Sequence, residues 1–251
     1  MLNKVLILAD SLALPREGAD DIPYEVTYPY LLEERLRQQS QIQLPVIIER
    51  AMRRRTIEYV LDEWFELVEL RRPDVIVIHV GIVDCAPRVF LRRERQFVEN
   101  LKWAWFRKGI LSFIHKHRAR IIRIRPRVYV PIERFERLLN EIIEKGRQLQ
   151  TALVFVNILE PPLEMEKRSP GFQQNVRRYN QAIASKVDGQ TARLIDLNSL
   201  IAQRGGAEKL TVDGIHLNRE GHEMLARELE SFVANYFKKD RLPRLVEYAQ
   251  R

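Results

Sequence analysis

Cysteine is almost absent from this sequence of 251 residues, which contains Cys85 alone. One thiol can form neither an internal disulfide nor a multi-thiolate metal site, so nothing in the composition requires an oxidising compartment. The sequence also lacks an uninterrupted apolar run of about 18 residues, which a membrane-spanning helix needs. The first apolar run, Val5–Ala9, is too short for the core of a signal peptide and leads straight into Asp10. We therefore expect a cytoplasmic protein that is at most peripheral to a membrane.

Low-complexity stretches and internal repeats are lacking too, and the rest of the composition is that of a globular chain. Hydrophobic residues make up 45% and charged residues 30% of the sequence, which is enough apolar material for a sizeable core. Lys and Arg number 42 against 34 Asp and Glu, so the formal net charge is +8 and the isoelectric point is about 9.7. We expect one domain over residues 1–237 and a polar C-terminal tail at 238–251.

Short apolar segments alternate with longer helical patterns along the chain. The segments that predict strands are apolar on both faces: Val5–Ala9, Leu44–Ile48, Val75–Val80, Ala152–Ile158 and Leu194–Leu197. Apolar residues at helical spacing predict helices at Tyr30–Gln38, from Thr56, from Ile132, through Val176–Ile183 and after Asn218. Strands that are apolar on both faces belong in a parallel sheet covered by helices on each side. The alternation predicts a doubly wound α/β domain, whose ligands bind beyond the carboxyl ends of the strands.

Polar residues occur where such a fold would place a site. Ser11 comes directly after the first predicted strand, and Asp213 and His216 lie in the loop before the last helix. A serine hydroxyl becomes nucleophilic when a histidine removes its proton and a carboxylate orients that histidine. These three side chains could fill the three roles. The G-x-S-x-G elbow of the α/β-hydrolases is absent, which argues against that class.

Three blocks of the sequence together resemble the SGNH, or GDSL, hydrolases. That family carries Gly-Asp-Ser-Leu near the N-terminus, G-x-N-D after the third strand and D-x-x-H near the C-terminus. Here the blocks read Ala-Asp-Ser-Leu at residues 9–12, Gly-Ile-Val-Asp at 81–84 and Asp-Gly-Ile-His at 213–216. The resemblance covers roughly residues 4–237. It implies a flavodoxin-like three-layer α/β fold with a central parallel sheet, and a catalytic triad of Ser11, His216 and Asp213.

The family's oxyanion-binding donors are altered in this sequence. The resemblance implies three of them: the backbone N–H of Ser11, a glycine N–H in a second block, and an asparagine side chain that Val83 replaces here. The second block, residues 49–55, contains no glycine; Arg54 is the best match to it, and Ala51 is the other candidate. Losing one oxyanion donor can lower a rate by about 10²- to 10³-fold.

Arginine could replace the missing donors, because a guanidinium presents several N–H groups and a full positive charge. Arg88 and the run Arg53–Arg55 lie on loops that we expect to approach Ser11. A site of this kind would favour substrates that carry a carboxylate or phosphate near the acyl group. Alternatively, these arginines form surface ion pairs with acids such as Glu49 and Glu58, and the oxyanion site is degraded.

Other residues near the third-strand block complete the predicted site. Gly81 would add a backbone N–H to the oxyanion site, and we interpret Asp84 as an acid that braces the loop beside the substrate. The Cys85 thiol is interpreted as a small buried apolar group. No pattern predicts a cofactor or metal site: His115 and His117 lie in a run of basic residues whose charge opposes metal binding.

The segment at 88–130 is longer than an ordinary α/β connection needs, which predicts an insertion. Within it, residues 101–118 mix aromatic and basic side chains and hold two of the three tryptophans. Such a helix could lie on a membrane surface, form a lid, contact a protein partner or pack on the sheet. Farther on, Arg123, Arg125 and Arg127 alternate with apolar residues, which predicts an extended segment with a basic stripe.

These observations predict a serine esterase, acyl hydrolase or O-acyltransferase that acts on an acylated, anionic carbohydrate and uses no cofactor. The string from Gly81 to Arg88 also resembles a subgroup linked to bacterial surface polysaccharides. The alternative is a non-catalytic relative that binds an anionic glycan, lipid or nucleic acid through its arginines. Because no nucleic-acid-binding module is recognisable and the basic residues are spread over several elements, we do not expect a nucleic-acid partner.

Overall fold

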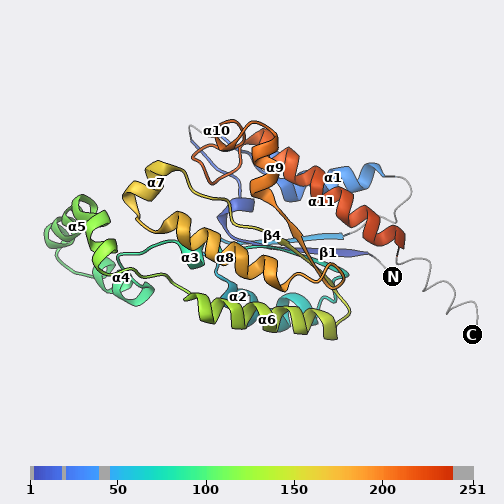
Figure 1. Cartoon of the computed structure of the whole chain (residues 1–251), viewed down its shortest axis with the longest axis horizontal. Coiled ribbons are helices and arrows are strands. Elements are labelled where there is room, and N and C mark those ends of the chain that lie inside the picture. Colours follow the sequence, from blue (N-terminus) through green and yellow to red (C-terminus); the bar gives the residue numbers. More distant parts are fainter. Residues whose placement is uncertain (1–2, 19–20, 40–45, 240–251) are drawn as a thin grey trace, which may run out of the picture.

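Five parallel strands form the central sheet, in the order β2-β1-β3-β4-β5 (Figure 1). They are β1 (Lys4–Ala9), β2 (Val46–Ala51), β3 (Val75–His79), β4 (Ala152–Val156) and β5 (Ala192–Ile195). The computed structural model describes residues 3–18, 21–39 and 46–239. Each strand pairing is parallel, so the carboxyl ends of all the strands lie along one edge of the sheet. The order is that of flavodoxin-like folds, and the predicted three-layer α/β fold is confirmed.

Helices cover both faces of the sheet (Figure 1). One face packs against α1 (Tyr28–Gln38), α9 (Leu197–Gln203) and α11 (Arg219–Lys239), and the other against α2 (Ile57–Asp62), the π-helical segment η3 (Phe65–Glu69), α6 (Ile132–Gln148) and α8 (Phe172–Lys186). Shorter elements are η1 (Ser11–Ala13), η2 (Tyr24–Val26), α3 (Ile82–Cys85), α7 (Leu163–Arg168) and α10 (Ala207–Leu210). The predicted insertion forms α4 (Arg92–Glu99) and α5 (Ala104–Ile124).

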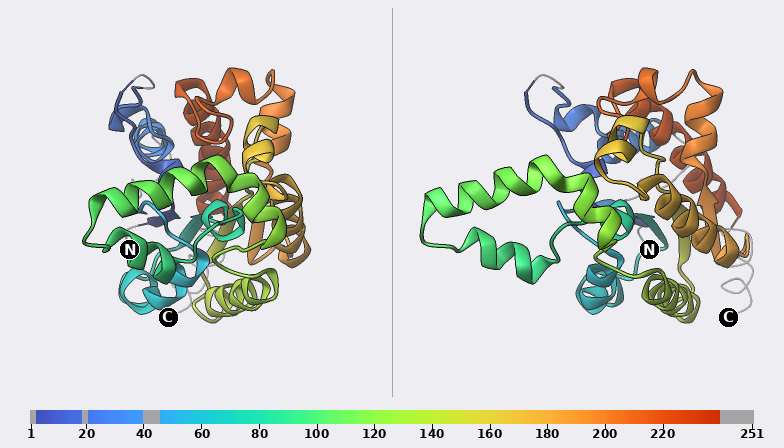
Figure 2. Two further views of the ribbon diagram at one scale, coloured as in Figure 1. Left: turned by 90° about the vertical axis from the view of Figure 1, so that its left-hand side faces the viewer. Right: turned by 60° about the vertical axis from the view of Figure 1, so that its left-hand side comes forward.

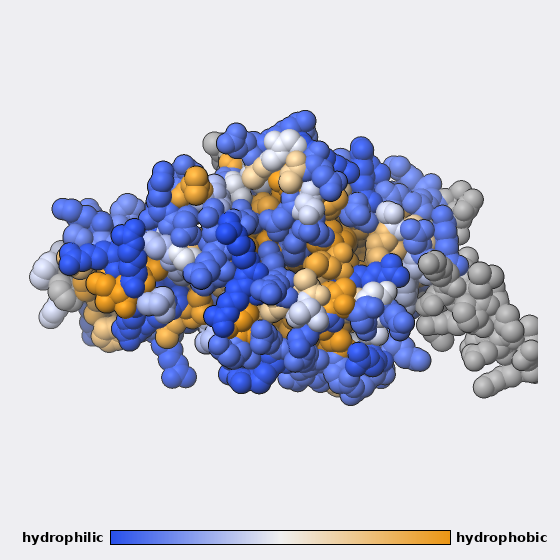
Figure 3. Space-filling view, in the orientation of Figure 1, coloured by the Kyte–Doolittle hydropathy of each residue, from blue (hydrophilic) through white to orange (hydrophobic). Residues whose placement is uncertain are grey.

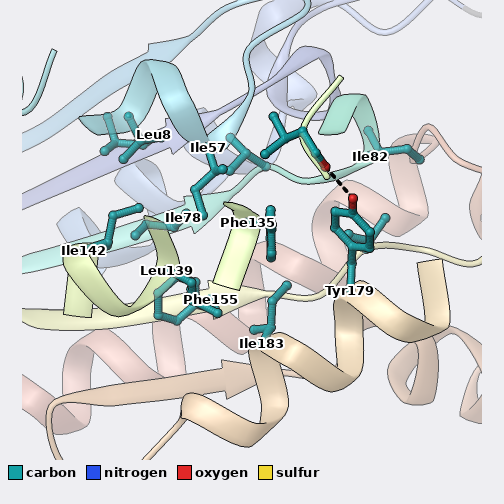
Figure 4. Close-up of a cluster of buried hydrophobic side chains, with 14 of the residues drawn as sticks. Leu8, Ile57, Ile78, Ile82, Phe135, Leu139, Ile142, Phe155, Tyr179 and Ile183 are labelled. Atoms are coloured by element: carbon teal, nitrogen blue, oxygen red, sulfur yellow. Dashed lines mark hydrogen bonds between the residues drawn. The ribbon is translucent and has the colours of Figure 1, made fainter. Parts of the chain in front are cut away.

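The strand side chains are buried on both faces of the sheet, because they alternate between two apolar layers. In β1, Val5 and Ile7 enter the layer under α1 and α11, whereas Leu6 and Leu8 enter the layer under α2 and α6. Figure 4 shows the second layer, where the Tyr179 hydroxyl donates a hydrogen bond to the main-chain carbonyl of Val130. Burying one large aliphatic side chain contributes about 1.5–3 kcal/mol, so these two layers fix the strand register.

Several element boundaries differ from the sequence predictions. Helix α1 begins two residues early, at Tyr28, because a proline in the first turn lacks only an N–H that would have no helical partner. The predicted start of the second strand at Leu44 lies outside the described residues. The C-terminal tail predicted from residue 238 also lies outside them from residue 240, after α11 has ended at Lys239.

The predicted extended basic stripe is wrong. Helix α5 continues to Ile124, so Arg123 is helical, and Arg127 turns back to form an ion pair with Glu94 in α4. Isoleucines flank Arg123 on both sides, and an alternating apolar pattern over so few residues fits the end of a helix as well as a strand. The helices α4 and α5 together form a hairpin that projects from the body of the protein (Figure 2).

Gly81 should tolerate substitution poorly. Its φ of 130° is strained for any L-residue, and a Cβ there would lie 2.7 Å from the Ile158 side chain. We expect Gly81→Ala to lower the free energy of unfolding by about 1–3 kcal/mol more than Gly189→Ala. Gly189 also has positive φ, at 72°, but open space around it. Urea denaturation of both variants measures the difference, and equal losses would contradict the predicted clash.

Candidate active site

Ser11 lies at the carboxyl edge of the sheet, where β1 turns into the short helix η1. The turn is shaped by Asp10, whose buried carboxylate caps η1 by accepting a hydrogen bond from the Leu12 N–H at 2.9 Å. The Asp10 N–H in turn donates to the His79 carbonyl at the end of β3. These bonds hold the backbone on both sides of Ser11 and tie the end of β1 to β3.

His216 and Asp213 approach Ser11 from the loop between α10 and α11. The Ser11 Oγ lies 3.4 Å from His216 Nε2, and the Asp213 Oδ2 lies 2.8 Å from His216 Nδ1. The other carboxylate oxygen, Oδ1, accepts the backbone N–H of His216 at 2.8 Å and that of Ile215 at 3.2 Å. The structure therefore brings the three predicted catalytic side chains together in the predicted order.

The Asp213 carboxylate is strongly held in its charged form. Partial burial would raise its pKa, but the hydrogen bonds from the ring and backbone of His216 outweigh that effect and hold the pKa at about 2. A charged acceptor at Nδ1 fixes the proton on that nitrogen, so Nε2 presents its lone pair to Ser11. Arg16, which follows η1, adds an ion pair to Asp213 with an N–O distance of 3.6 Å.

Two pockets adjoin Ser11. The larger, of about 520 Å³, is polar, and five arginines gather around it: Arg16, Arg53, Arg54, Arg88 and Arg95. The smaller, of about 230 Å³, is bounded by Ile82, Pro87, Arg118, Phe172 and Ile215. Ser11, Val83, Arg88 and His216 line both. A substrate could thus place different groups in the two pockets.

Arg88 is the arginine most closely built into the site. Its guanidinium lies over the Tyr129 ring at 4.7 Å and donates to the Val83 carbonyl at 3.3 Å, while its Nε is buried without a hydrogen-bond partner. Burial lowers the pKa of this guanidinium. Among the described residues no acidic side chain forms an ion pair with it. An anion beside Ser11 would satisfy both its charge and its open donor.

The second-block arginines divide into two groups. Arg53 and Arg54 are exposed at the polar pocket, as predicted, and Arg54 has a φ of 66°, in the left-handed region that glycine usually occupies. The prediction for Arg55 is wrong: its side chain is buried, donating to the Arg50 carbonyl and pairing with Glu63 at 3.1 Å. Ala51, the other candidate for the glycine position, is the last residue of β2.

The alternative, that these arginines pair with Glu49 and Glu58, does not match the ion pairs seen among the described residues. Glu58 pairs with Arg134 on α6, and Glu49 accepts a hydrogen bond from the Tyr24 hydroxyl. Arg53 and Arg54, within the part of the chain that the structure describes, have no ion pair either. The positive charge of the polar pocket is therefore not neutralised by these acids.

The predicted residues of the third-strand block differ in whether they line the pockets at Ser11. Val83 lines both pockets, and its side chain offers no hydrogen-bond donor there. Gly81 lines neither pocket: it is buried at the start of α3, against Ile158. Asp84 also lines neither pocket and is fully buried. One of its carboxyl oxygens accepts a hydrogen bond from the Ile57 N–H at 3.0 Å, which braces the start of α2.

Some residues at the site could not be found from sequence blocks. Tyr129 follows the hairpin, Ser169 lies between α7 and α8, and Phe172 begins α8, all far from any predicted site block. Arg16 did have a local signal, because it lies five residues after Ser11 in the same loop. Among the residues described, no three His, Cys, Asp or Glu side chains gather closely enough to hold a metal ion.

Comparison with known proteins identifies the family of this chain. The sequence model of the GDSL-like lipase/acylhydrolase family matches residues 10–224. The chain therefore belongs to the GDSL-like lipase/acylhydrolase family, and this membership supports a hydrolase that acts on esters. A search of curated protein sequences finds no match.

Solved structures of similar fold include three enzymes, each covering 92% of this chain. A lipase/acylhydrolase from Enterococcus faecalis is 15% identical, with 96% of its own chain covered and a TM-score of 0.63. An α/β hydrolase from a Lake Arreo metagenome is 19% identical, with 95% covered and a TM-score of 0.61. A catalytic mutant of Axe2, an acetylxylan esterase from Geobacillus stearothermophilus, is 15% identical, with 94% covered and a TM-score of 0.61. At these identities the likeness shows the shared fold.

The buried acids beneath the site should make stability depend on pH. Burial raises the pKa of Asp84 to about 8 and that of Asp10 to about 7, against an ordinary value of 3.8. At these two carboxyls the folded state keeps protons that the unfolded chain releases, so their contribution to the free energy of unfolding falls as pH rises from about 4 to about 8. Burial lowers the pKa of His79 to about 3 and that of His222 to about 4, so these histidines add a contribution of opposite sign, which rises up to about pH 6.5. The slope for each carboxyl is at most about 1.4 kcal/mol per pH unit.

The variant Asp84→Asn removes one of these titrations without changing the shape of the side chain. We expect the stability of the variant relative to that of the wild type to increase as pH rises through this range, and Asp62→Asn, on the exposed end of α2, to follow the wild type. Urea denaturation at a series of pH values measures the slopes. Parallel curves for wild type and Asp84→Asn would show that Asp84 is not held protonated.

Proposed function

We propose that this protein is a serine esterase that removes an acyl group from an anionic carbohydrate. The observation that carries the proposal is the series of contacts from Ser11 Oγ to His216 Nε2 and from His216 Nδ1 to the Asp213 carboxylate. Nucleophile, base and orienting acid lie beside two pockets at the edge where the strands end. This is the arrangement that nucleophilic acyl transfer requires.

In the first half of the reaction, Ser11 Oγ attacks the carbonyl carbon of the ester as its proton passes to His216 Nε2. The imidazolium that forms is stabilised by the Asp213 carboxylate, which stays unprotonated throughout. Collapse of the tetrahedral intermediate breaks the bond to the alcohol oxygen, which takes the proton from Nε2. The second half repeats these steps with water, which releases the acid and restores Ser11. The distance of 3.4 Å between the two side chains would shorten when substrate excludes water.

The oxyanion needs donors, and in this chain arginine would supply part of them. The backbone N–H of Ser11 remains, whereas Val83 provides nothing in place of the family's asparagine. Arg88 lines both pockets at Ser11 and has a buried Nε–H with no partner. A guanidinium already desolvated at this point needs little reorganisation as negative charge develops, which favours the transition state.

The same arginines point to an anionic substrate. The polar pocket is bounded by five arginines and one acid, Glu17, among its described residues. Of these arginines, Arg95 pairs with Glu99 and Arg16 with Asp213, which leaves Arg53, Arg54 and Arg88 for a ligand. A carboxylate or phosphate on the sugar would meet them, and the acetylxylan esterase among the solved structures of this fold supports an acylated carbohydrate.

The alternative is a non-catalytic member that binds an anionic glycan, and the observation that favours it is Val83 at the asparagine position. Transfer of the acyl group to a sugar hydroxyl, in place of water, would use the same triad. Variants of the triad and of the arginines separate catalysis from binding. Product analysis with and without an acceptor sugar separates hydrolysis from transfer.

Replacing the members of the triad should abolish ester hydrolysis. We expect Ser11→Ala and His216→Ala each to reduce hydrolysis of a p-nitrophenyl acetate probe to the uncatalysed rate, and Asp213→Asn to retain a small residual activity. Ser185→Ala, on the exposed face of α8, serves as the control and should retain wild-type activity. If the wild type and Ser11→Ala hydrolyse the probe at one background rate, the non-catalytic alternative holds.

Arginine variants should separate charge recognition from general damage. The probes are acetylated glucuronic acid and acetylated glucose, which differ in the carboxylate. We expect Arg88→Ala and Arg54→Ala to lower kcat/KM for the acidic probe at least about tenfold more than for the neutral one, since hydrogen bonds to charged groups are the stronger kind. Arg134→Ala, whose side chain pairs with Glu58, is the matched control.

The variant Val83→Asn tests whether the oxyanion site is rebuilt or degraded. With arginine already supplying the donor, restoring asparagine should raise activity on the neutral probe by less than about tenfold, well below the 10²- to 10³-fold value of a lost donor. A gain in activity of 10²- to 10³-fold would show that the oxyanion site of the wild type is degraded. For the arginine variants, equal losses of kcat/KM on the acidic and neutral probes would show that these side chains do not recognise the charge of the substrate.

A further inference from the structure

The hairpin formed by α4 and α5 stands apart from the rest of the molecule. It projects beyond the layers that sandwich the sheet, so much of its surface faces away from the body (Figure 2). Helix α5 has 21 residues, more than any strand-covering helix except α11. A hairpin this long is not needed to close the α/β fold, whose other connections are short.

Large apolar side chains lie exposed along this hairpin. The most exposed are Phe97 at 70%, Trp103 at 68%, Trp105 at 74%, Phe113 at 62% and Ile124 at 75% of their full surface. In Figure 3 apolar surface is visible among the hydrophilic surface at the end of the molecule where Figure 1 labels α4 and α5. Exposed aromatic residues gathered on one projecting element indicate an interaction surface.

The positive charge of the protein is concentrated on the same hairpin. Residues 91–125 contain eleven Lys and Arg, and their only acids are Glu94 and Glu99. This segment thus carries a formal charge of +9, whereas the whole chain carries +8, so the remainder is close to neutral. Both acids already form ion pairs, Glu94 with Arg127 and Glu99 with Arg95. Any partner of the hairpin must therefore be strongly negative.

We infer that the hairpin docks this protein onto the surface of an anionic lipid bilayer. Tryptophan and phenylalanine side chains partition into the boundary between headgroups and acyl chains, while neighbouring Lys and Arg bind anionic headgroups. None of the helices within the described residues is long and apolar enough to cross a bilayer, so docking is interfacial. Trp103 and Trp105 lie where α5 begins, with Lys102, Arg107 and Lys108 beside them.

Other occupants of this surface fit the observations less well. A second copy of the chain would bring two segments of charge +9 together, and their repulsion opposes association. Single-stranded nucleic acid could stack on the aromatic rings, but the exposed aliphatic side chains of Leu111 and Ile124 have no face for stacking. A bilayer accepts aromatic and aliphatic side chains alike.

The hairpin also borders the active-site region, so docking has a consequence for the site. Leu111 and Ile114 of α5 line an apolar pocket of about 560 Å³, which shares Arg88, Arg118 and Phe172 with the smaller pocket at Ser11. A docked hairpin would hold the Ser11 region close to the lipid surface. Docking itself does not depend on the proposed esterase activity.

Vesicle sedimentation of the whole protein tests the inference. We expect wild type to sediment with vesicles of phosphatidylcholine and phosphatidylglycerol, to bind vesicles of phosphatidylcholine alone far less, and to be released by salt. The triple variant Lys102→Glu, Arg107→Glu, Lys108→Glu and the double variant Trp103→Ser, Trp105→Ser should each weaken binding to the mixed vesicles at least about tenfold. Leu163→Ser and Lys186→Glu, which change exposed or partly exposed residues off the hairpin, should bind as wild type does.

Two further measurements keep docking separate from catalysis and folding. Hydrolysis of p-nitrophenyl acetate without lipid should be unchanged in the hairpin variants, and circular dichroism should show wild-type helix content. Docking is refuted if wild type does not sediment with the mixed vesicles, if the control variants lose as much binding as the hairpin variants, or if wild type binds single-stranded RNA but not the vesicles. Dimers that disappear in the tryptophan variant, with no vesicle binding, would refute it in favour of self-association.

Discussion

The contact between the Asp213 carboxylate and the His216 ring is the interaction on which the site depends. Within a loop of four residues, one carboxylate accepts the ring N–H, the backbone N–H of His216 and that of Ile215. Hydrogen bonds within its own loop are thus sufficient to orient the imidazole. The remaining requirement is that Ser11 lie opposite Nε2, and the parallel strands meet it by ending at one edge. Local hydrogen bonding and sheet topology contribute separately to the same geometry.

Arg88 gives the site its particular chemistry. A guanidinium that is largely buried without an acidic partner is unfavourable in the unliganded protein, and it persists here where the Tyr129 ring and the Val83 carbonyl compensate it in part. The full compensation would come from an anion on the substrate or from the oxyanion of the transition state. Under the proposed function, binding and catalysis would be coupled through this one side chain, in a site that lacks the family's asparagine donor.

Sequence patterns predicted the elements that depend on local or repeating features. Apolar strands identified the sheet, and the spacing of Asp213 and His216 was sufficient to predict their contact, because both lie in one loop. The orientation of Arg55 was not predictable, since it depends on Glu63, which follows α2, and on the Arg50 carbonyl in β2. Ser169 and Phe172 reach the site only through the packing of α7 and α8, which leaves no local pattern. The end of α5 was misjudged because isoleucine and arginine alternate there over a few residues.

Labelling with a fluorophosphonate, followed by mass spectrometry of the peptides, tests the central claim most directly. The reagent forms a covalent bond with a serine only when a base removes its proton, so it reports the activation of Ser11 whatever the natural substrate is. The account predicts one modified residue, Ser11, in the folded wild-type protein, and loss of the modification in His216→Ala. A folded wild-type protein that resists the reagent, or that is modified at another residue, would contradict the account.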